Sequence, residues 1–234
     1  MIRTHWAPEA ELDRWNAYLD LSTNDPITLG PILANKVGAV TWAELRSRED
    51  AFVAMRAMTL HSHGIPGSYD LDGLRAIHRH LFQDVYEWAG ELRTVTTGKC
   101  EPFATPDEIE SVMLHVAERV MRTQRFRGMS EVAVCAELAR AHHQMNLAHP
   151  FRLGNGRAQR EFITALAAES DHVVDWTTVT GEAEATALRR ARHGDLASLI
   201  VMYGDALSPV STTLGPGPSA RHSLIPNRSG GVWR

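Results

Sequence analysis

His149-Pro150-Phe151-Arg152-Leu153-Gly154-Asn155-Gly156-Arg157-Ala158-Gln159-Arg160 is the stretch of this 234-residue chain that says most about its fold and its chemistry. Gly154 and Gly156 are free to adopt positive φ, because they carry no Cβ atom. Successive main-chain N–H groups can therefore converge on one point, as they do where a backbone nest binds an anion. The stretch predicts a loop that holds a phosphate group.

A helix is predicted directly after the glycines, since residues 158–168 are mostly good helix formers. The glycine loop would then lie at a helix N-terminus, where free N–H groups and the helix dipole favour an anion. Arg157 and Arg160 are three residues apart, which puts both guanidinium groups on one side of that helix. Their planar forks match phosphate oxygens well. Both features favour a polyphosphate ligand.

One histidine precedes the glycine loop. His149 titrates near neutral pH, Pro150 stiffens the link to the loop, and Phe151 can anchor that link in the core. Gly154-Asn155-Gly156 alone would be an ordinary interhelical turn, because Gly and Asn are turn formers. With His149 and the two arginines in register, the favoured interpretation is a phosphate site that has its own general base.

Composition restricts the classes of protein to consider. Hydrophobic residues make up 44% and charged residues 22% of the chain, as in ordinary globular proteins, and a formal net charge of -4 gives no footprint for nucleic acid. The start lacks an apolar signal core, and no run approaches the roughly 20 apolar residues that span a bilayer. Cys100 and Cys135 show no paired spacing. We expect a cytoplasmic protein without nucleic-acid or membrane partners, and secretion as an effector stays open.

The chain is predicted to have three parts. Residues 1–35 form an N-terminal adapter segment, with a short helix around residues 10–19 followed by a loop rich in Thr, Asn, Asp and Pro. Residues 36–206 form the main domain. Residues 207–234 are rich in Ser, Pro and Gly and form a disordered tail.

The main domain is predicted to be all-α. Capping residues followed by apolar residues at helical spacing mark most of the starts, such as Thr41 with Glu44, Asp70, and Thr105 with Glu108. His78 and His80, within the second of these helices, are interpreted as surface or capping histidines. The predicted helices cover residues 41–63, 70–81, 105–120, 130–147, 158–170, 182–192 and 195–203.

Only one stretch of the main domain predicts a strand. Residues 92–97 contain β-branched residues in alternation, and Gly98 follows them. We expect a short β-hairpin flap with Gly98 and Lys99 at or just after its turn. Lys99 is interpreted either as a loop lysine or as a phosphate contact.

The motif from His149 to Arg160 resembles the signature of the Fic (Fido) family, His-Pro-Phe-x-Asp/Glu-Gly-Asn-Gly-Arg-x-x-Arg. Residues 70–94, which include Val85-Tyr86-Glu87-Trp88-Ala89-Gly90, look like that family's helix and the entry to its flap. Pro102-Phe103-Ala104 looks like the segment after the flap. The resemblance covers roughly residues 30–205 and implies a compact all-α Fic-type domain with a β-hairpin flap over the active site.

The resemblance also implies an activity, the transfer of AMP from ATP to a Ser, Thr or Tyr hydroxyl of a target protein. His149 would be the general base. Gly154, Asn155 and Gly156 would cradle the phosphates, Arg157 would neutralise the leaving pyrophosphate, and Arg160 would contact the γ-phosphate. The flap would pair with an extended segment of the target by strand addition. Its residues are Leu92, Arg93, Thr94, Val95, Thr96, Thr97 and Gly98.

Leu153 is the one specified position that departs from the signature, since family members usually have Asp or Glu there to hold Mg2+. Leucine has no oxygen to offer a hard cation. No metal ligand is therefore predicted at this position, and Mg2+ would ride on the nucleotide phosphates and water. Two alternatives to AMP transfer stay open: the transfer of another phosphate-containing group, as in Doc-type members, and a degenerate domain that binds nucleotide or partners without catalysis.

Many members of the family carry an inhibitory Ser/Thr-x-x-x-Glu-Gly/Asn segment whose Glu pairs with the last arginine of the motif. The pairs Thr97/Glu101, Thr178/Glu182 and Thr180/Glu184 have the first spacing, but Pro or Ala follows each Glu. The resemblance therefore implies the class whose inhibitor is a separate small antitoxin, with Arg160 as the residue it would engage and a toxin–antitoxin pair as the context.

Overall fold

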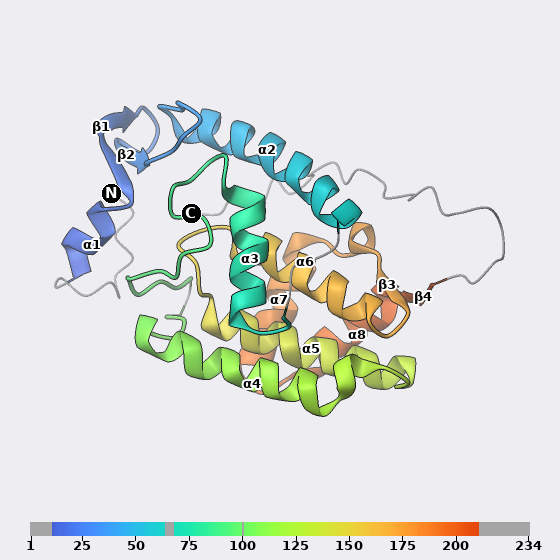
Figure 1. The fold of residues 1–234 in the computed structure, drawn as a ribbon. Coiled ribbons are helices and arrows are strands. Elements are labelled where there is room, and N and C mark those ends of the chain that lie inside the picture. Colours follow the sequence, from blue (N-terminus) through green and yellow to red (C-terminus); the bar gives the residue numbers. More distant parts are fainter. Residues whose placement is uncertain (1–10, 64–67, 100, 211–234) are drawn as a thin grey trace. The chain divides into compact units, whose positions relative to one another are not determined.

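The computed structural model describes residues 11–63, 68–99 and 101–210. Within them the chain is mainly helical, which confirms the predicted fold class (Figure 1). The helices are α1 (Leu12–Asn16), α2 (Trp42–His63), α3 (Leu71–Phe82), α4 (Ile109–Arg122), α5 (Glu131–Ala148), α6 (Asn155–Ala168), α7 (Gly181–Arg192) and α8 (Ala197–Ala206). The strands are β1 (Leu19–Asp25), β2 (Gly30–Leu33), β3 (His172–Val174) and β4 (Leu207–Pro209), and the 3-10 turns are η2 (Pro106–Glu108), η3 (Gln124–Phe126) and η4 (Trp176–Thr178).

The described chain divides into two compact units. The first holds the described residues up to Met121 together with Gln144–Ile163, and the second holds Arg122–His143 and the described residues from Thr164 onward. The whole motif from His149 to Arg160 therefore lies in the first unit. The boundaries 1–35, 36–206 and 207–234 stay predictions.

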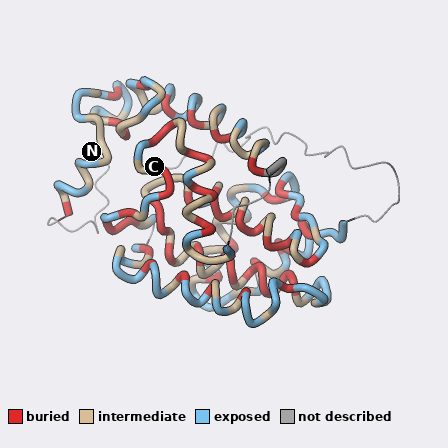
Figure 2. The backbone as a smooth tube through the Cα atoms, viewed as in Figure 1, coloured by how far each residue is buried: buried red, intermediate tan, exposed pale blue. Residues whose placement is uncertain are grey.

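Helix α3 packs against α2 in the first unit (Figure 1). Asp70 caps α3 as predicted, because its carboxylate accepts a hydrogen bond from the Gly73 N–H at 3.0 Å. Figure 2 shows buried and exposed residues alternating along α3 and α4, the pattern of amphipathic helices. The largest buried side chains of α3 are those of Leu74, Ile77, His78, Leu81 and Phe82.

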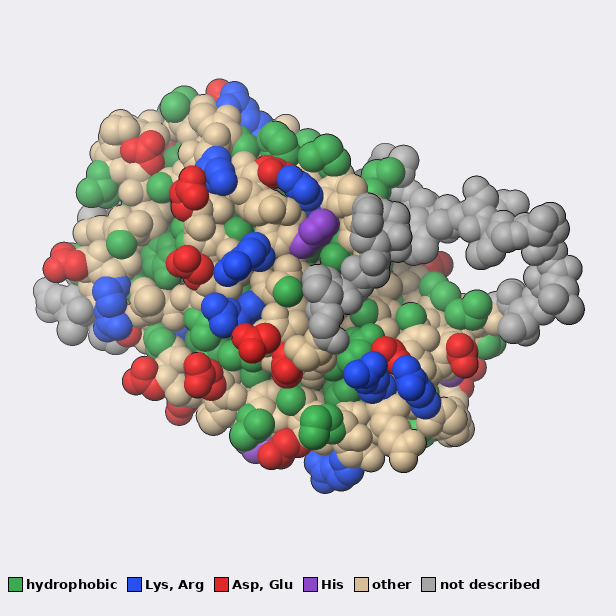
Figure 3. All heavy atoms as spheres, viewed as in Figure 1, with side chains coloured by type: hydrophobic (Ala, Val, Ile, Leu, Met, Phe, Trp, Pro, Cys, Tyr) green, Lys and Arg blue, Asp and Glu red, His purple; other side chains and the backbone are tan. Residues whose placement is uncertain are grey.

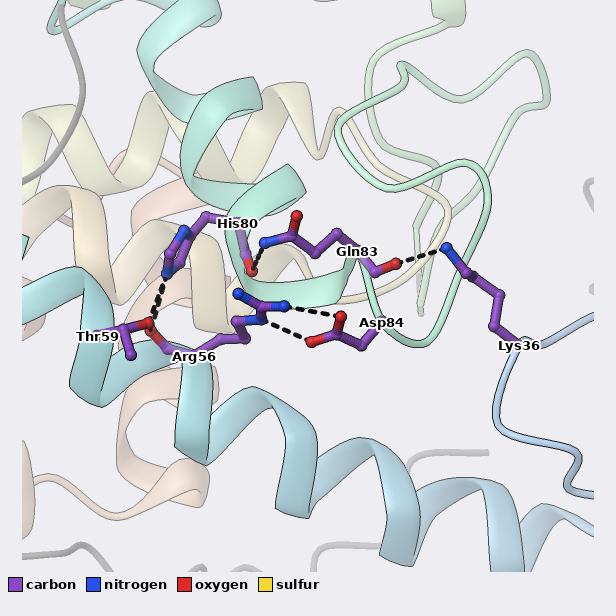
Figure 4. A network of polar contacts seen from close by, with 6 residues as sticks. All are labelled: Lys36, Arg56, Thr59, His80, Gln83 and Asp84. Atoms are coloured by element: carbon purple, nitrogen blue, oxygen red, sulfur yellow. Dashed lines mark hydrogen bonds and ion pairs between the residues drawn. The ribbon is translucent and has the colours of Figure 1, made fainter.

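Polar side chains join α2 to α3 and to the turn that follows it (Figure 4). Arg56 of α2 donates to Asp84 from Nε at 2.6 Å and from Nη2 at 2.8 Å. Thr59 shares a hydrogen bond with Nε2 of His80 at 3.0 Å. The bidentate geometry of the Arg56–Asp84 pair gives direction as well as attraction, so it helps to fix the turn after α3 against α2.

The N-terminal segment contains a β-hairpin that the sequence does not reveal. Strands β1 and β2 pair antiparallel, with Leu19 opposite Leu33 and Asp20 opposite Ile32. The predicted loop is wrong here, although Thr, Asn, Asp and Pro do favour turns. Strand β1 shows no regular alternation of buried and exposed residues, and Leu19 and Leu21 are its only apolar residues, so its sequence carries little strand signal.

Asp25 ties this hairpin to the start of α2. Its Oδ1 accepts the N–H groups of Ile27 at 3.0 Å and Thr28 at 2.8 Å, which closes the turn, and its Oδ2 accepts the N–H of Trp42 at 2.9 Å. These hydrogen bonds, led by the one from Thr28, hold the pKa of the Asp25 carboxyl below its ordinary value. The charged carboxylate is therefore the form that joins the two elements.

The stretch predicted as a strand, residues 92–97, is irregular. A single bridge pairs Gly98 with Pro102, and the Phe103 N–H donates to the Thr97 carbonyl at 2.8 Å. The turn of the flap hairpin and the start of its second arm are therefore present, and residues 92–97 form no longer β-ladder. Val95, Thr96 and Thr97 are all buried, so the β-branched residues reflect burial of consecutive positions rather than alternation.

In the second unit, α7 packs against α8, and β3 pairs antiparallel with β4 with Val173 opposite Ser208. Trp176 donates from Nε1 to the Thr164 hydroxyl at 2.8 Å. Strand β4 begins at Leu207, where a disordered tail was predicted to begin. The rest of that predicted tail, residues 211–234, lies outside the described residues.

Basic and acidic side chains are interspersed on the face drawn in Figure 3. This distribution agrees with the small formal net charge of -4. Among the helices of the described ranges, none is both long and apolar enough to cross a membrane.

Replacing Asp25 with Asn should lower the thermal midpoint at pH 7, since an amide cannot accept hydrogen bonds with both of its terminal atoms. The folded pKa lies below the ordinary value of 3.8, so this stabilisation is present above that value and is lost as the pH falls through the folded pKa. The difference in midpoint between Asp25→Asn and wild type, followed by circular dichroism, should shrink as the pH is lowered to about 3. The exposed Asp72→Asn change is the control, and a gap that widens in acid would contradict the assignment.

Candidate active site

The motif loop begins where α5 ends. His149 follows the last helical residue, Ala148, and has a φ of 42°, in the left-handed region that few residues other than glycine adopt. Its N–H donates to the Met145 carbonyl at 2.9 Å, the bond that closes a helix C-terminus. Pro150 disfavours a helical conformation of the residue before it, so α5 stops at this point. The sequence thus places His149 at a fixed helix end.

The imidazole of His149 stacks on the ring of Phe103. The two ring centroids are 3.7 Å apart and the planes differ by 4°. Phe103 is buried and belongs to the return of the flap, where its N–H bonds the Thr97 carbonyl. The flap therefore holds the plane of the predicted base. Sequence reasoning placed Phe103 only after the flap and missed this contact.

Arg93 joins the flap to the loop. It is 1% exposed, and its main-chain N–H donates to the Pro150 carbonyl at 2.9 Å. Burial lowers the pKa of its guanidinium to about 10, which still leaves the group charged at neutral pH. The Arg93 side chain points into the protein rather than toward a docking segment. Its guanidinium donates to four carbonyl oxygens, those of His149 (2.8 Å), Val95 (2.7 Å), Ala148 (3.1 Å) and Ala104.

Main-chain groups of the flap are also bonded by side chains from the N-terminal segment. Glu11 accepts from the Thr96 N–H at 2.6 Å and from its hydroxyl at 3.0 Å. Arg14 donates to the Thr94 carbonyl at 3.0 Å, and the Tyr18 hydroxyl accepts from the Thr94 N–H at 3.2 Å. We call Glu11, Arg14 and Tyr18 the N-terminal clasp. Strand addition along Thr94–Thr96 at these groups requires that the clasp release them.

Gly154 ends the loop and begins α6. Its φ is +82°, and its carbonyl accepts the first helical hydrogen bond, from the Ala158 N–H at 3.1 Å. A Cβ atom there would lie 2.4 Å from Cζ of Phe82, so only glycine fits. The expectation of positive φ is right for Gly154 and wrong for Gly156, which lies within α6 and has open space where its Cβ would be.

Asn155 is buried and uses its side chain on the loop itself. Its Oδ1 accepts from the Phe151 N–H at 2.9 Å, and its Nδ2 donates to the Phe151 carbonyl at 2.7 Å. The side-chain amide therefore shapes the loop, and the main-chain N–H is what Asn155 offers a ligand. The N–H groups in the first turn of a helix have no partner within it, so the start of α6 is a candidate anion site.

His78 contacts the loop at Phe151 and Leu153. This position corrects its interpretation as a surface or capping residue. It is fully buried, its Nδ1 accepts from the Gly90 N–H at 2.9 Å, and its Nε2 lies 2.9 Å from the Leu153 carbonyl. Because Nδ1 accepts, Nε2 carries the proton and donates. Burial lowers the pKa of His78 to about 3, so the ring is neutral. It also stacks on Phe151, with centroids 3.9 Å apart.

Arg157 extends from α6 toward two carboxylates of α2. Its guanidinium is 3.1 Å from Oδ1 of Asp50 and also pairs with Glu49. Its Cζ lies 5.1 Å from the centre of the Phe82 ring, in cation–π geometry. Arg160 follows on the same helix and is half-buried. No pattern in the sequence indicated the carboxylates, since contact across 107 residues leaves no local signal.

Lys99 and Leu153 are two further positions that the sequence singled out. Lys99 is exposed at the turn of the flap, and its N–H donates to the Glu101 carbonyl at 3.1 Å. Leu153 is half-buried, and its carbonyl is the acceptor for His78. Among the described side chains, no three His, Cys, Asp or Glu residues gather where they could share a metal ion.

This geometry defines a class of protein, a helical domain in which one short loop joins a histidine at a helix end to an anion site at the next helix start. The model of the Fic/DOC family matches residues 68–167. Protein adenylyltransferase VbhT of Bartonella schoenbuchensis is 35% identical over 184 residues, which are 76% of this chain and 38% of VbhT. The protein named probable protein adenylyltransferase y4lH of Sinorhizobium fredii is 38% identical over 135 residues, 57% of this chain and 70% of y4lH. The chain belongs to the Fic/DOC family.

A solved structure shares the fold. BepC, a VirB-translocated effector protein of Bartonella tribocorum with bound AMPPNP, matches with a TM-score of 0.74 and 25% identity, over 83% of this chain and 97% of that chain. The predicted Fic-type fold is confirmed. The stretch shared with VbhT is well under half of VbhT's own length.

The two glycines of the loop should respond in opposite ways to alanine. Gly154→Ala should lower the free energy of unfolding by about 2 to 5 kcal/mol, because the left-handed conformation and the contact with Phe82 both oppose a methyl group. Gly156→Ala, in a helix with open space, should leave it unchanged or raise it by about 0.5 to 1 kcal/mol. Urea denaturation measures both values, and equal losses at the two positions would rule out this account of the loop.

Proposed function

We propose that this chain transfers AMP from ATP to a Ser, Thr or Tyr hydroxyl of a target protein. The observation that carries the proposal is the single loop that joins His149, at the end of α5, to the first turn of α6. Hydrogen bonds from His78, Asn155 and Arg93 hold this loop, so the base and the anion site keep one geometry. Relatives named protein adenylyltransferase support AMP as the group transferred.

In the proposed reaction, the His149 imidazole accepts the proton of the target hydroxyl while the hydroxyl oxygen attacks the α-phosphorus. A phosphorus–oxygen bond to the target forms, the bond from the α-phosphorus to the bridging oxygen breaks, and pyrophosphate leaves with its electron pair. The N–H groups that begin α6 stabilise the charge that develops on the phosphoryl oxygens. The stack on Phe103 limits rotation of the imidazole, which favours one direction of proton transfer.

The residues at the start of α6 fit a nucleoside triphosphate. The open space at Gly156 allows phosphate oxygens to approach the backbone, and Arg157 and Arg160 add charge on one side of α6. BepC binds AMPPNP in the related fold. Mg2+, when bound, would offset phosphate charge. Leu153 has no oxygen donor, so phosphate oxygens and water would hold the ion in place of a side chain at this position.

We also propose that the target docks on the flap by strand addition, and that a separate small antitoxin engages Arg160. The missing inhibitory Ser/Thr-x-x-x-Glu-Gly/Asn segment supports the second proposal. A cytoplasmic toxin is the role this favours. VirB translocation of BepC supports the alternative role of a secreted effector.

Leu153 favours a second candidate function, a degenerate domain that binds nucleotide or partners without AMP transfer. Transfer of a different phosphate-containing group is the third candidate. The intact Gly154-Asn155-Gly156-Arg157 sequence favours AMP transfer over the Doc-type reaction, because Doc-like members usually change that loop.

Labelled ATP separates these candidates. The purified protein is incubated with lysate and with ATP labelled at the α- or the γ-phosphate. We expect α-label on protein, a loss of at least about 100-fold for His149→Ala because the base is removed, and no loss for His115→Ala, an exposed histidine of α4. His149-dependent transfer of γ-label would indicate phosphate transfer, and no His149-dependent label on any protein would indicate the degenerate domain.

Leu153→Glu should raise the rate of AMP transfer about tenfold in the presence of Mg2+, because a carboxylate would add an oxygen ligand for the ion. Leu153→Gln is the neutral control and should change the rate less. The gain should disappear when EDTA removes the ion. A rate that is unchanged or lower with Mg2+ would show that this domain positions the phosphates without a ligand at 153.

A further inference from the structure

Arg157 lies between two neighbouring carboxylates that differ in burial. Glu49 and Asp50 are consecutive residues of α2, and both pair with its guanidinium. The Glu49 side chain is 5% exposed, whereas the Asp50 side chain is 36% exposed. Their effects on a phosphate-binding arginine can therefore differ, because one carboxylate is fixed in the protein and the other can turn toward water.

Both oxygens of Glu49 are in use. Arg157 donates to Oε1, and the hydroxyl of Tyr86 donates to Oε2. Burial and the neighbouring charge of Glu49 raise the pKa of Tyr86, so the phenol keeps its proton and remains a donor. A buried carboxylate that loses its cation is strongly destabilised. The pair between Glu49 and Arg157 should therefore persist when a ligand arrives.

The remaining contacts of Arg157 keep it beside the anion site. Its guanidinium lies over Phe82, and the same ring stands where a Cβ of Gly154 would be. A guanidinium has five N–H donors, and the contacts with Glu49 and Asp50 use one terminal nitrogen each. Donors are left over for phosphate while Glu49 holds the group in place.

We infer that Glu49 is a positioning residue for Arg157, and that Asp50 competes with the ligand's phosphates for the same guanidinium. The inference rests on the proposed function, because it takes Arg157 to contact the phosphates beyond the α-phosphate. The two carboxylates should therefore have opposite effects on the affinity for polyphosphate. Neutralising the buried carboxylate weakens binding, and neutralising the exposed carboxylate beside it strengthens binding.

Isothermal titration with ATP, ADP and AMP tests the inference. We expect Glu49→Gln to weaken ATP binding about tenfold, equivalent to about 1.4 kcal/mol, and to leave AMP binding nearly unchanged. Asp50→Asn, the same chemical change one residue further on, should tighten ATP binding by a few fold. The dependence on phosphate number is the readout that a general loss of structure would not give.

Tyr86→Phe provides a second route, because it removes the other donor to Glu49 and should weaken ATP binding in the same direction but less. It decides the matter if circular dichroism shows that Glu49→Gln does not fold. Wild-type protein that fails to bind ATP would overturn the proposed function. If the wild-type protein binds ATP and Glu49→Gln binds it equally well or more tightly, this inference alone is overturned. If Glu49→Gln does not fold, unchanged ATP affinity of the folded Tyr86→Phe variant has the same meaning.

Discussion

The rest of the site depends on the hydrogen bonds that the buried guanidinium of Arg93 donates. The last carbonyl groups of α5 have no partner within the helix, and Arg93 bonds the carbonyl of Ala148, the last helical residue, and that of His149, which follows it. The same side chain bonds Val95 and Ala104 on the two sides of the flap. Burying a charge is unfavourable unless its hydrogen bonds are made, and here they are made to segments that would otherwise separate. A cation at a helix C-terminus also gains from the helix dipole.

Two histidines of the site differ in role because they differ in environment. His78 stays neutral well below physiological pH, and only its neutral form can both accept from Gly90 and donate to Leu153. His78 therefore keeps its hydrogen bonds to Gly90 and Leu153 across the pH range in which an ordinary histidine titrates. His149 lies at the left-handed end of α5 with its imidazole stacked on Phe103, and it is the histidine for which we propose proton transfer.

The sequence predicts what local pattern encodes. Capping residues and the spacing of apolar residues predict α2 to α8. Gly154 and the helix predicted after it indicate the loop between α5 and α6. The sequence does not predict contacts between distant segments: His78 looks like a surface residue until Leu153 is beside it, and Glu49 has no distinguishing neighbours along the chain. The β1–β2 hairpin was missed because Asp25 stabilises it through side-chain bonds rather than through a two-residue period.

The N-terminal clasp covers main-chain groups of the flap without forming a strand. Main-chain groups without partners pair readily with any extended chain, and the clasp occupies groups of the flap that would otherwise be open to such pairing. Glu11, Arg14 and Tyr18 bond separate groups of Thr94 and Thr96, and Arg14 also lies 3.6 Å from the Glu11 carboxylate, so these two side chains are coupled. Because the clasp is tethered to the same chain, it is present at high effective concentration. A segment that paired with these groups would have to outcompete an internal ligand, so main-chain pairing alone would give it little advantage. Its side chains would then have to supply the selectivity.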